Sequence, residues 1–153
     1  MRQIIQLVLL VSLLLAPSWT LSFNFHPAGL TPKSSWYFLE IAKEEIVLFF
    51  TFSPVEKINK IIDFSTEKLT ETEEMWQENN QSSAQKSLDR FRSLLQRIED
   101  LIPSAQKEKN FLNKKDVWQE ILAQELVFLI DNQDRDQVKD LINLVKETKK
   151  QLQ

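Results

Sequence analysis

The feature that most limits the fold of this chain is its near-complete lack of glycine. One glycine, Gly29, occurs among 153 residues, and none follows it. Tight β-turns depend on residues that tolerate positive φ, above all glycine. The stretch from Leu30 to Gln153 is instead rich in Leu, Ile, Glu, Gln and Lys, which are mostly good helix formers. The sequence therefore predicts an all-α protein, and its length suits a single domain.

Two heptad seams predict that this fold is built around an antiparallel helical hairpin. In each seam, apolar or small residues recur at alternating spacings of three and four, as in packed helices. The first seam comprises Val55, Ile58, Ile62, Ser65, Leu69, Thr72 and Trp76, widened by Ile61 and Met75. The second comprises Ala84, Leu88, Phe91, Leu95, Ile98 and Ile102, widened by Leu94 and Leu101. A short polar turn joins them, so we expect Leu69 to pack near Phe91 and Ile62 near Ile98.

The hairpin belongs to a predicted helical bundle of about five helices within residues 23–153. Its core spans residues 31–102, and two C-terminal helices occupy residues 116–152. The fourth helix carries Trp118, Ile121, Leu122, Leu126, Leu129 and Ile130, and the fifth carries Val138, Leu141, Ile142 and Val145. Between them and the hairpin, Pro103 stops or kinks the third helix, and residues 104–115 fit either a helix or a loop.

Capping boxes predict where four of these helices begin. In such a box, a Ser, Thr or Asp side chain satisfies backbone N–H groups of the first turn, and a Glu or Gln follows three residues later. The pairs are Ser53 with Glu56, Ser82 with Gln85, Asp116 with Gln119, and Asp134 with Gln137. Pro54 strengthens the first box, because proline suits the first helical position.

The first helix, within Gly29–Phe50, is expected to begin near Thr31–Ser35 and to be apolar around most of its circumference. Its polar strip is narrow and consists of Glu40, Lys43 and Glu44. Such a helix is buried by neighbouring helices or by lipid, and charged residues are costly in lipid. We therefore expect it to be the buried spine against which the hairpin packs. Its aromatic residues then belong to the core or, alternatively, line a pocket for an apolar ligand: Trp36, Tyr37, Phe38, Phe49, Phe50 and Phe52.

The N-terminal segment, residues 1–22, has the pattern of a secretory signal peptide. One basic residue, Arg2, precedes the apolar run Ile4–Leu15, and small residues follow it, which is the order that such signals share. The run is short for a membrane span of about 20 residues, although an uncleaved anchor over Ile4–Leu21 is the alternative. Either interpretation predicts an exported chain, located in the periplasm, outside the cell or at the envelope. Membrane contact is expected only through this segment, if it is uncleaved.

Catalytic or cofactor chemistry has little support in the residues. No cysteine occurs, and the only histidine, His26, lies in an irregular lead-in without ligand partners, so we expect no metal site and no cofactor. A row of carboxylates, Glu67, Glu71, Glu74 and Glu78, occupies one helix face. It is either a cation-binding stripe or, as we favour, a solvated face that pairs with basic residues such as Lys86, Arg90 and Arg97. The net charge of −3 is too mild to indicate a nucleic-acid partner.

Several short motifs in the first two helices resemble a family of exported bacterial proteins, catalogued as domain of unknown function 5667. That family carries a Thr-Pro-x-Ser-x-x-Tyr opening, an apolar helix ending near Phe-Thr, a Pro-x-x-Lys corner and a Glu-Arg-Leu-x-Glu segment. The matching residues are Thr31, Pro32, Ser34, Tyr37, Phe50, Thr51, Pro54, Lys57, Glu67, Leu69 and Glu71. Lys68 stands where the family pattern has Arg. The resemblance covers about residues 29–102 and implies an exported helical fold, without adding any chemistry.

These observations favour a non-catalytic exported module that binds another protein or the cell envelope, because long amphipathic helices can accept partner helices. The alternative is a carrier or chaperone-like protein that holds an apolar ligand between its helices. An enzyme is not expected. An open apolar groove would favour the carrier, and a closed aromatic core would favour the interaction module.

Overall fold

The computed structural model of the chain describes residues 32–153. The expected signal segment, residues 1–22, and the lead-in with His26 lie outside the described residues. The described part is all-α, as the lack of glycine predicts, and contains five helices and no strand. These helices are α2 (Tyr37–Phe49), α3 (Pro54–Gln77), α4 (Gln81–Ala105), α5 (Phe111–Asp131) and α6 (Asp136–Gln151). None of them combines the length and the apolar character that crossing a membrane requires.

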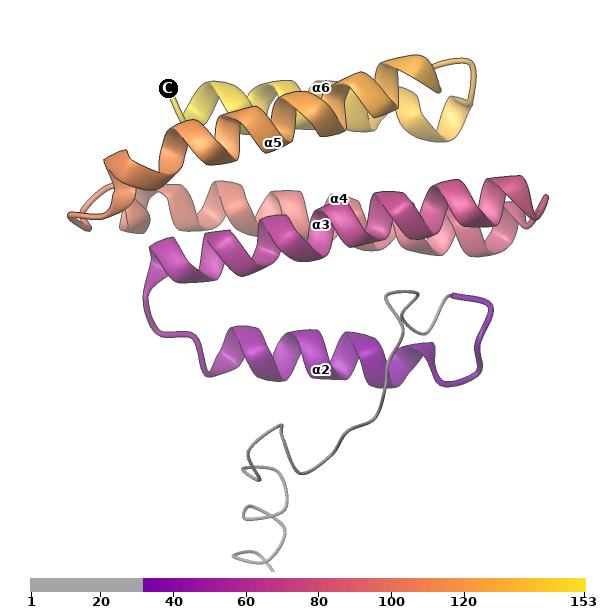
Figure 1. Cartoon of the computed structure of the whole chain (residues 1–153), viewed down its shortest axis with the longest axis horizontal. Helices are drawn as coiled ribbons and strands as arrows, with labels where there is room; N and C mark the ends of the chain where they lie inside the picture. Colours follow the sequence, from indigo (N-terminus) through magenta and orange to yellow (C-terminus); the bar gives the residue numbers. More distant parts are fainter. Residues whose placement is uncertain (1–31) are drawn as a thin grey trace, which may run out of the picture.

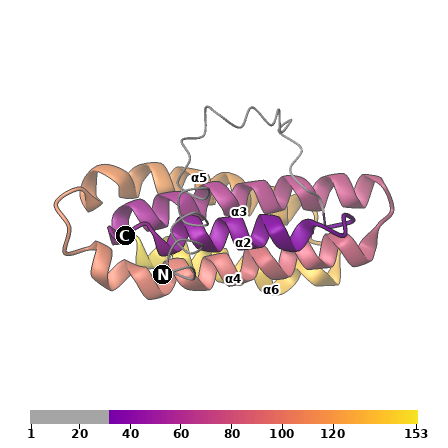
Figure 2. The same cartoon turned by 90° about the horizontal axis from the view of Figure 1, so that it is seen from below.

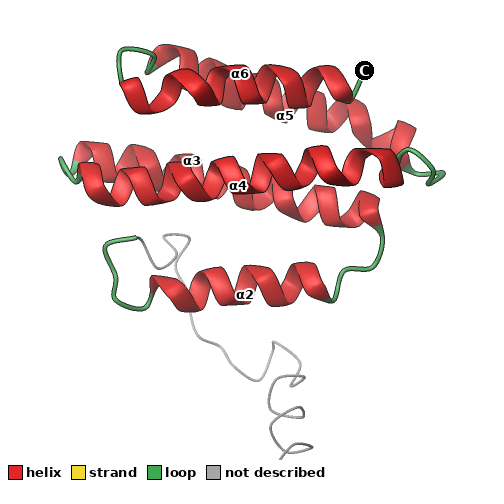
Figure 3. Ribbon diagram, turned by 180° about the vertical axis from the view of Figure 1, so that it is seen from behind, coloured by secondary structure: helices red, strands yellow, loops and turns green. Residues whose placement is uncertain are grey.

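The helices form three layers. The α3–α4 hairpin is the middle layer, the α5–α6 hairpin covers one side of it, and α2 alone covers the other (Figure 1). Seen from below, α2 runs along the line between α3 and α4 (Figure 2). The connections between helices are short and lie at the ends of the bundle (Figure 3). The predicted helical bundle around an antiparallel hairpin is therefore confirmed.

The two predicted seams form the buried centre of the middle layer. All thirteen seam residues are buried, as are the widening residues Ile61, Met75 and Leu94. The antiparallel register is visible across the turn, where Ser87 Oγ donates to Glu71 Oε2 at 3.0 Å. The pairs expected to pack, Leu69 with Phe91 and Ile62 with Ile98, lie in one continuous hydrophobic cluster. Phe91 is fully buried.

The turn between α3 and α4 uses asparagine where glycine is usual. Asn79 has a φ of 56°, the left-handed conformation that commonly ends a helix. The N–H of Asn80 donates to the carbonyl of Met75 at 2.8 Å, and the N–H of Asn79 donates to Trp76 at 3.0 Å. This pair of bonds is the Schellman pattern, and it satisfies carbonyls that the end of α3 leaves open.

One of the four predicted caps is confirmed and three are wrong. Ser53 accepts from the N–H of Glu56, with Pro54 at the first helical position. The cap of α4 is Asn80, not Ser82, because the Asn80 side chain accepts from the Ser83 N–H. Asp116 lies inside α5, whose first residue is Phe111. Asp134 lies outside α6, which begins after Arg135.

Residues 104–115, which the sequence allows to be either helix or loop, are part helix and part loop. Helix α4 continues past Pro103 to Ala105, and α5 begins at Phe111. Pro103 is tolerated because it lies so close to the end of α4 that it interrupts only its last turn. Ser53 Oγ also donates to Glu108 Oε2 at 2.7 Å, which fixes the turn between α4 and α5 to the start of α3.

Helix α2 departs most from the sequence prediction. It begins at Tyr37, after turn residues 32–36, rather than near Thr31–Ser35. It is not a buried spine, because its only buried residues are Tyr37, Glu44 and Leu48. Glu40 and Glu44 of the narrow polar strip face the hairpin, whereas Lys43 is exposed and most of the apolar residues face away from it. The prediction was wrong because the hairpin surface that α2 contacts carries the cations Lys68 and Arg90, which require carboxylates opposite them.

Candidate functional site

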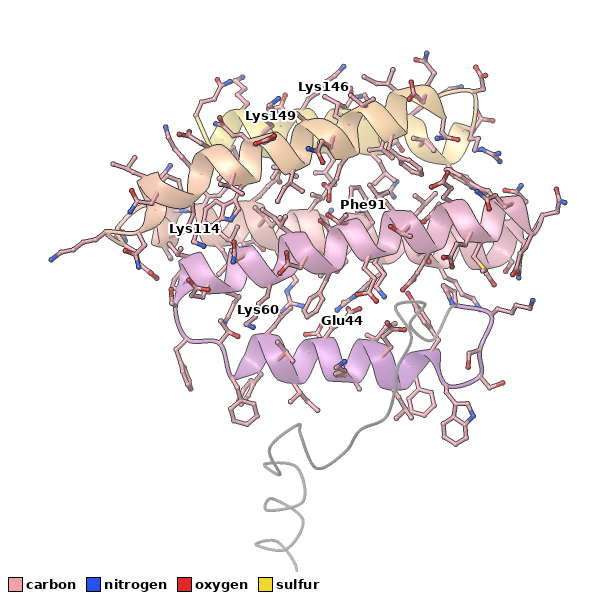
Figure 4. The ribbon with its side chains drawn as sticks, in the orientation of Figure 1. Glu44, Lys60, Phe91, Lys114, Lys146 and Lys149 are labelled. Carbon is pink, nitrogen blue, oxygen red and sulfur yellow. The ribbon has the colours of Figure 1, made fainter. Side chains whose placement is uncertain are left out.

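The contact between α2 and the hairpin is centred on a buried lysine. Lys68 of α3 is fully buried, and its ammonium nitrogen lies 2.6 Å from Glu71 Oε1 and 2.9 Å from Glu44 Oε1. Glu40 Oε1 is farther away, at 3.8 Å. The Tyr37 ring, with its centroid 5.2 Å from the same nitrogen, adds a cation–π contact. In Figure 4 the labelled Glu44 lies between α2 and the hairpin.

Two arginines of α4 continue this network toward the end of α2. Arg90 donates through Nε and Nη2 to Glu44 Oε2, at 2.9 and 2.7 Å. Its Nη2 also donates to Glu45 Oε1 at 2.8 Å, and Arg97 Nη1 donates to the same oxygen at 2.7 Å. Glu44 therefore pairs with a cation from each helix of the hairpin, Lys68 of α3 and Arg90 of α4. These two ion pairs hold α2 along the line between α3 and α4.

The protonation equilibria in the network follow from burial and from these charges. Burial alone would lower the pKa of Lys68, but the hydrogen bond and charge of Glu71, together with Glu44, raise the pKa above its usual value. Burial raises the pKa of Glu40 to about 7, with the Lys68 charge opposing the shift. It also raises the pKa of Glu71, and it raises the pKa of Tyr37 to about 12. Below about pH 7, where Glu40 is mostly neutral, its carboxyl group adds no negative charge beside Lys68.

The opposite face of α2 is apolar and exposed. Ring side chains project from the side of α2 that faces away from the hairpin (Figure 4). Phe49 is 74% exposed, and Phe52, in the connection to α3, is 86% exposed. We define the outer face of α2 as the large apolar residues exposed here: Trp36, Phe38, Leu39, Ile46, Phe49, Phe50 and Phe52. Of the six aromatic residues predicted to be core or pocket lining, only Tyr37 is buried.

The helical period explains this inversion. Tyr37, Glu44 and Leu48, together with Ile41, recur at spacings of four and three and lie on one side of the helix. This side meets Lys68 and Arg90, so it must carry carboxylates, because an unpaired buried cation would be far more costly than exposed phenyl rings. The remaining apolar residues are then left on the outer face.

The predicted carboxylate row is divided between two environments. Glu71 is buried, Glu67 and Glu74 are half-buried, and Glu78 is exposed and pairs with Lys33 at 3.1 Å. The expected pairing with Arg90 and Arg97 is wrong, since both arginines bind carboxylates of α2. Carboxylate oxygens of Glu40, Glu67 and Glu71 lie within 4.8 Å of one another. Lys68 already supplies a positive charge at that point, so the row is neither a simple solvated face nor a free cation site.

A sequence profile of the family described as "Domain of unknown function (DUF5667)" matches residues 29–153. The chain belongs to this family. The match extends beyond residues 29–102, which carry the resemblance, and includes both C-terminal helices. No curated protein matches the chain, and no solved structure matches it. In this DUF5667 chain the family's Thr-Pro-x-Ser-x-x-Tyr opening leads directly into α2, and its last residue, Tyr37, is the aromatic ring beside Lys68.

The residues that sequence reasoning missed can be recognised by their heptad positions. Lys68 lies seven residues after Ile61 and seven before Met75, in the row that widens the first seam. Ser87 lies seven residues before Leu94, in the corresponding row of α4. Both are fully buried. A polar residue in a row that is otherwise apolar is therefore the sequence signal for a buried polar site. In the DUF5667 pattern the position of Lys68 carries Arg, which is also a base.

Proposed function

We propose that this DUF5667 chain is an exported, non-catalytic interaction module that lies against the lipid surface of the cell envelope through the outer face of α2. One observation carries the proposal: α2 turns its carboxylates toward the hairpin, while seven large apolar side chains on the helix and at its two ends are exposed. Contiguous exposed apolar patches mark sites of protein or membrane interaction. A helix used only for packing would have no need of this arrangement.

The dimensions and chemistry of α2 favour a membrane surface as the occupant. Its 13 residues make it about 20 Å long, which is short of the roughly 30 Å hydrocarbon core. A helix of this kind lies in the plane of the interface, with its apolar side toward the acyl chains. Trp36 at its start suits the headgroup level. Beside the outer face, α2 also carries one exposed cation, Lys43, which favours anionic lipids.

The neighbouring sequence supports the same location. The apolar run Ile4–Leu15 precedes α2, and it is expected to direct export or to remain as an anchor. If Ile4–Leu21 is retained as an anchor, the fifteen residues 22–36 reach at most about 50 Å when fully extended. In that case the outer face of α2 is tethered close to the bilayer, and its contact would add to the N-terminal one, which the sequence alone predicts to be the only membrane contact.

The carrier alternative has less support. The aromatic residues that would line a carrier's pocket are exposed on the outer face of α2 instead. An apolar ligand held between helices would need those side chains to lie between helices, whereas ring side chains project from the side of α2 that faces away from the hairpin (Figure 4). We therefore develop the membrane-surface proposal alone.

Spin labelling of the full chain in vesicles tests the proposal. Because the chain has no cysteine, Ile46→Cys places one nitroxide on the outer face of α2. Lys146→Cys places a control nitroxide at an exposed position of α6. In vesicles of phosphatidylethanolamine with phosphatidylglycerol, we expect the label at 46 to be accessible to oxygen and shielded from a water-soluble nickel chelate. The label at 146 should remain open to the chelate.

Two results would overturn the proposal. Equal access of the chelate to positions 46 and 146 would show that the outer face stays in water even when the chain is attached to the vesicle. Strong dipolar coupling between labels at position 46 would show that a second copy, not lipid, covers this face. The export part is tested separately, by a reporter fused after Gln153. Reporter activity restricted to the cytoplasm would contradict it.

A further inference from the structure

A third buried carboxylate, Glu125 of α5, lies on the other side of the hairpin from Glu44 and Glu71 and has no cationic partner among the described residues. It is 4% exposed and occupies a seam position of α5 between Leu122 and Leu129. Its Oε1 accepts hydrogen bonds from Ser65 Oγ at 2.7 Å and from Thr66 Oγ1 at 3.0 Å. Its Oε2 is also buried but has no hydrogen-bond partner. An unpaired buried carboxylate oxygen is costly, so this atom requires an explanation.

The residues around Glu125 line a cavity between α3 and α5 that is open to solvent. Its volume is about 170 Å³, compared with the roughly 30 Å³ that one water molecule occupies in the liquid. Glu125 and Glu73 line it together with threonine and glutamine side chains, and Leu69, Ile121 and Phe128 supply apolar wall. No basic residue is among the described residues that line it. The lining therefore disfavours anions and favours a positively charged ligand with an apolar body.

The geometry points to a small organic ammonium ion as the ligand of this cavity, held by Glu125 Oε2 and covered by Leu69, Ile121 and Phe128. An ammonium group offers hydrogen-bond donors, and one of them satisfies the carboxylate oxygen that the protein leaves unpaired. A calcium ion is a poorer fit because it requires six to eight oxygen ligands, and part of this wall is hydrocarbon. The apolar wall suits an alkyl chain of a few carbons.

The protonation of Glu125 gives this assignment a distinctive pH dependence. Burial raises the pKa of Glu125 to about 7, and the hydrogen bonds from Ser65 and Thr66 oppose the shift. Glu73 is the one other titratable group among the described residues that line the cavity. An ammonium ion binds the ionised carboxylate, so binding near pH 6 must release most of one proton, whereas binding above pH 8 should release almost none. Affinity should therefore fall as the pH decreases below 7.

Titration of the full chain with n-butylammonium chloride tests the inference. Backbone amide shifts of α3 and α5 report binding, and calorimetry in two buffers of different ionisation enthalpy reports the released proton. We expect saturable binding at pH 8, with shifts centred on residues that line the cavity. Glu125→Gln keeps the shape of the side chain and should weaken binding at least about tenfold, whereas Glu120→Gln, exposed on the same helix, should change it less than about twofold.

Further controls keep the inference falsifiable. Neutral n-butanol shares the alkyl body and should bind much more weakly than n-butylammonium. Ile121→Phe should block the cavity without removing the hydrogen bonds of Glu125. It replaces Glu125→Gln as the test variant if Glu125→Gln lowers stability. Absence of saturable shifts at 100 mM n-butylammonium would overturn the inference and indicate a cavity filled by water. Equal binding by the parent and Glu125→Gln would overturn it as well.

Discussion

The two sides of the α3–α4 hairpin are covered in opposite ways. On the α5–α6 side, the buried contacts are mainly apolar, and they include Trp118, Leu122, Leu141 and Val145. On the α2 side, the contact consists mainly of buried charges. The same hairpin therefore accepts one neighbour by hydrophobic burial and the other by ion pairing. The comparison teaches that the direction in which a helix faces depends on its partner's surface as well as on its own hydropathy.

The two kinds of contact should also fail differently. Apolar burial is roughly proportional to area, so small losses of side chain give small losses of stability. A buried ion pair contributes little net stability, yet removal of one partner leaves an uncompensated charge. We therefore expect the α2 side to be specific and fragile, and the α5–α6 side to be tolerant.

Phe91→Ala should have the largest effect on global stability. Phe91 is fully buried in the hairpin, and its truncation should lower the free energy of unfolding by about 3–5 kcal/mol. Lys86→Ala, on an exposed position of the same helix, should cost less than about 0.5 kcal/mol. Thermal and urea unfolding measure both. A Phe91→Ala midpoint within a degree or two of the parent would show that the seam is wrongly assigned.

Lys68→Ala should be nearly as costly but act locally. The substitution leaves Glu44 and Glu71 buried without their ammonium, which costs about 3 kcal/mol, the low end of the range for broken buried pairs, because release of α2 admits water. Lys139→Ala, which removes an exposed ion pair with Asp136, should leave the unfolding midpoint close to that of the parent. Hydrogen exchange should show lost protection in α2, with protection kept in α5 and α6. Equal loss in all helices would contradict a separable α2 contact.

The docking of α2 should weaken as pH rises through the pKa of Glu40, which burial raises to about 7. A carboxyl with a raised pKa in the folded state is most stabilising below its unfolded value and loses that contribution as it ionises. Protection of α2 amides should therefore fall between about pH 5 and pH 8. Glu40→Gln mimics the neutral form and should reduce this slope, leaving a contribution of the same sign from Glu71. An unchanged slope in the variant would refute the role of Glu40.

Phe49→Ala should have the smallest effect. Phe49 is 74% exposed on the outer face of α2, so its loss should change the free energy of unfolding by less than about 0.5 kcal/mol. The contrast with Phe91→Ala is direct, because the same side chain is truncated at a buried and at an exposed position. A cost for Phe49→Ala comparable to that for Phe91→Ala would mean that α2 does pack its apolar face inward.

The fold was predictable because the hairpin seams obey a local rule. Alternating spacings of three and four identified the buried residues of α3 and α4 from positions alone. Cap residues were less predictable, because Asn80 and Ser82 both have side chains able to cap, and the choice depends on where the chain turns. The left-handed Asn79 decides that turn.

The orientation of α2 was not predictable from the period of α2 itself. It depends on Lys68, which lies 24 positions after Glu44 in the sequence and contacts it only in the folded chain. The only sequence feature that indicated this contact was Lys68 itself, a lysine in the row of Ile61 and Met75, where an apolar residue is expected. Glu125 gave a similar sign, since it interrupts the apolar spacing of α5. In both cases the polar exception in an apolar row marked a buried site.

The most direct test of the account is the reactivity of single thiols on α2. Because the chain has no cysteine, the separate variants Ile46→Cys and Leu48→Cys each carry a single thiol. These positions are 51% and 0% exposed in the parent. With a maleimide reagent in the absence of membranes, position 46 should react at close to the rate of the unfolded chain. Position 48 should react at least about 100-fold more slowly, because it requires local opening of α2. Faster labelling at position 48 than at position 46 would contradict the central claim that α2 turns its charged side to the hairpin and its apolar side outward.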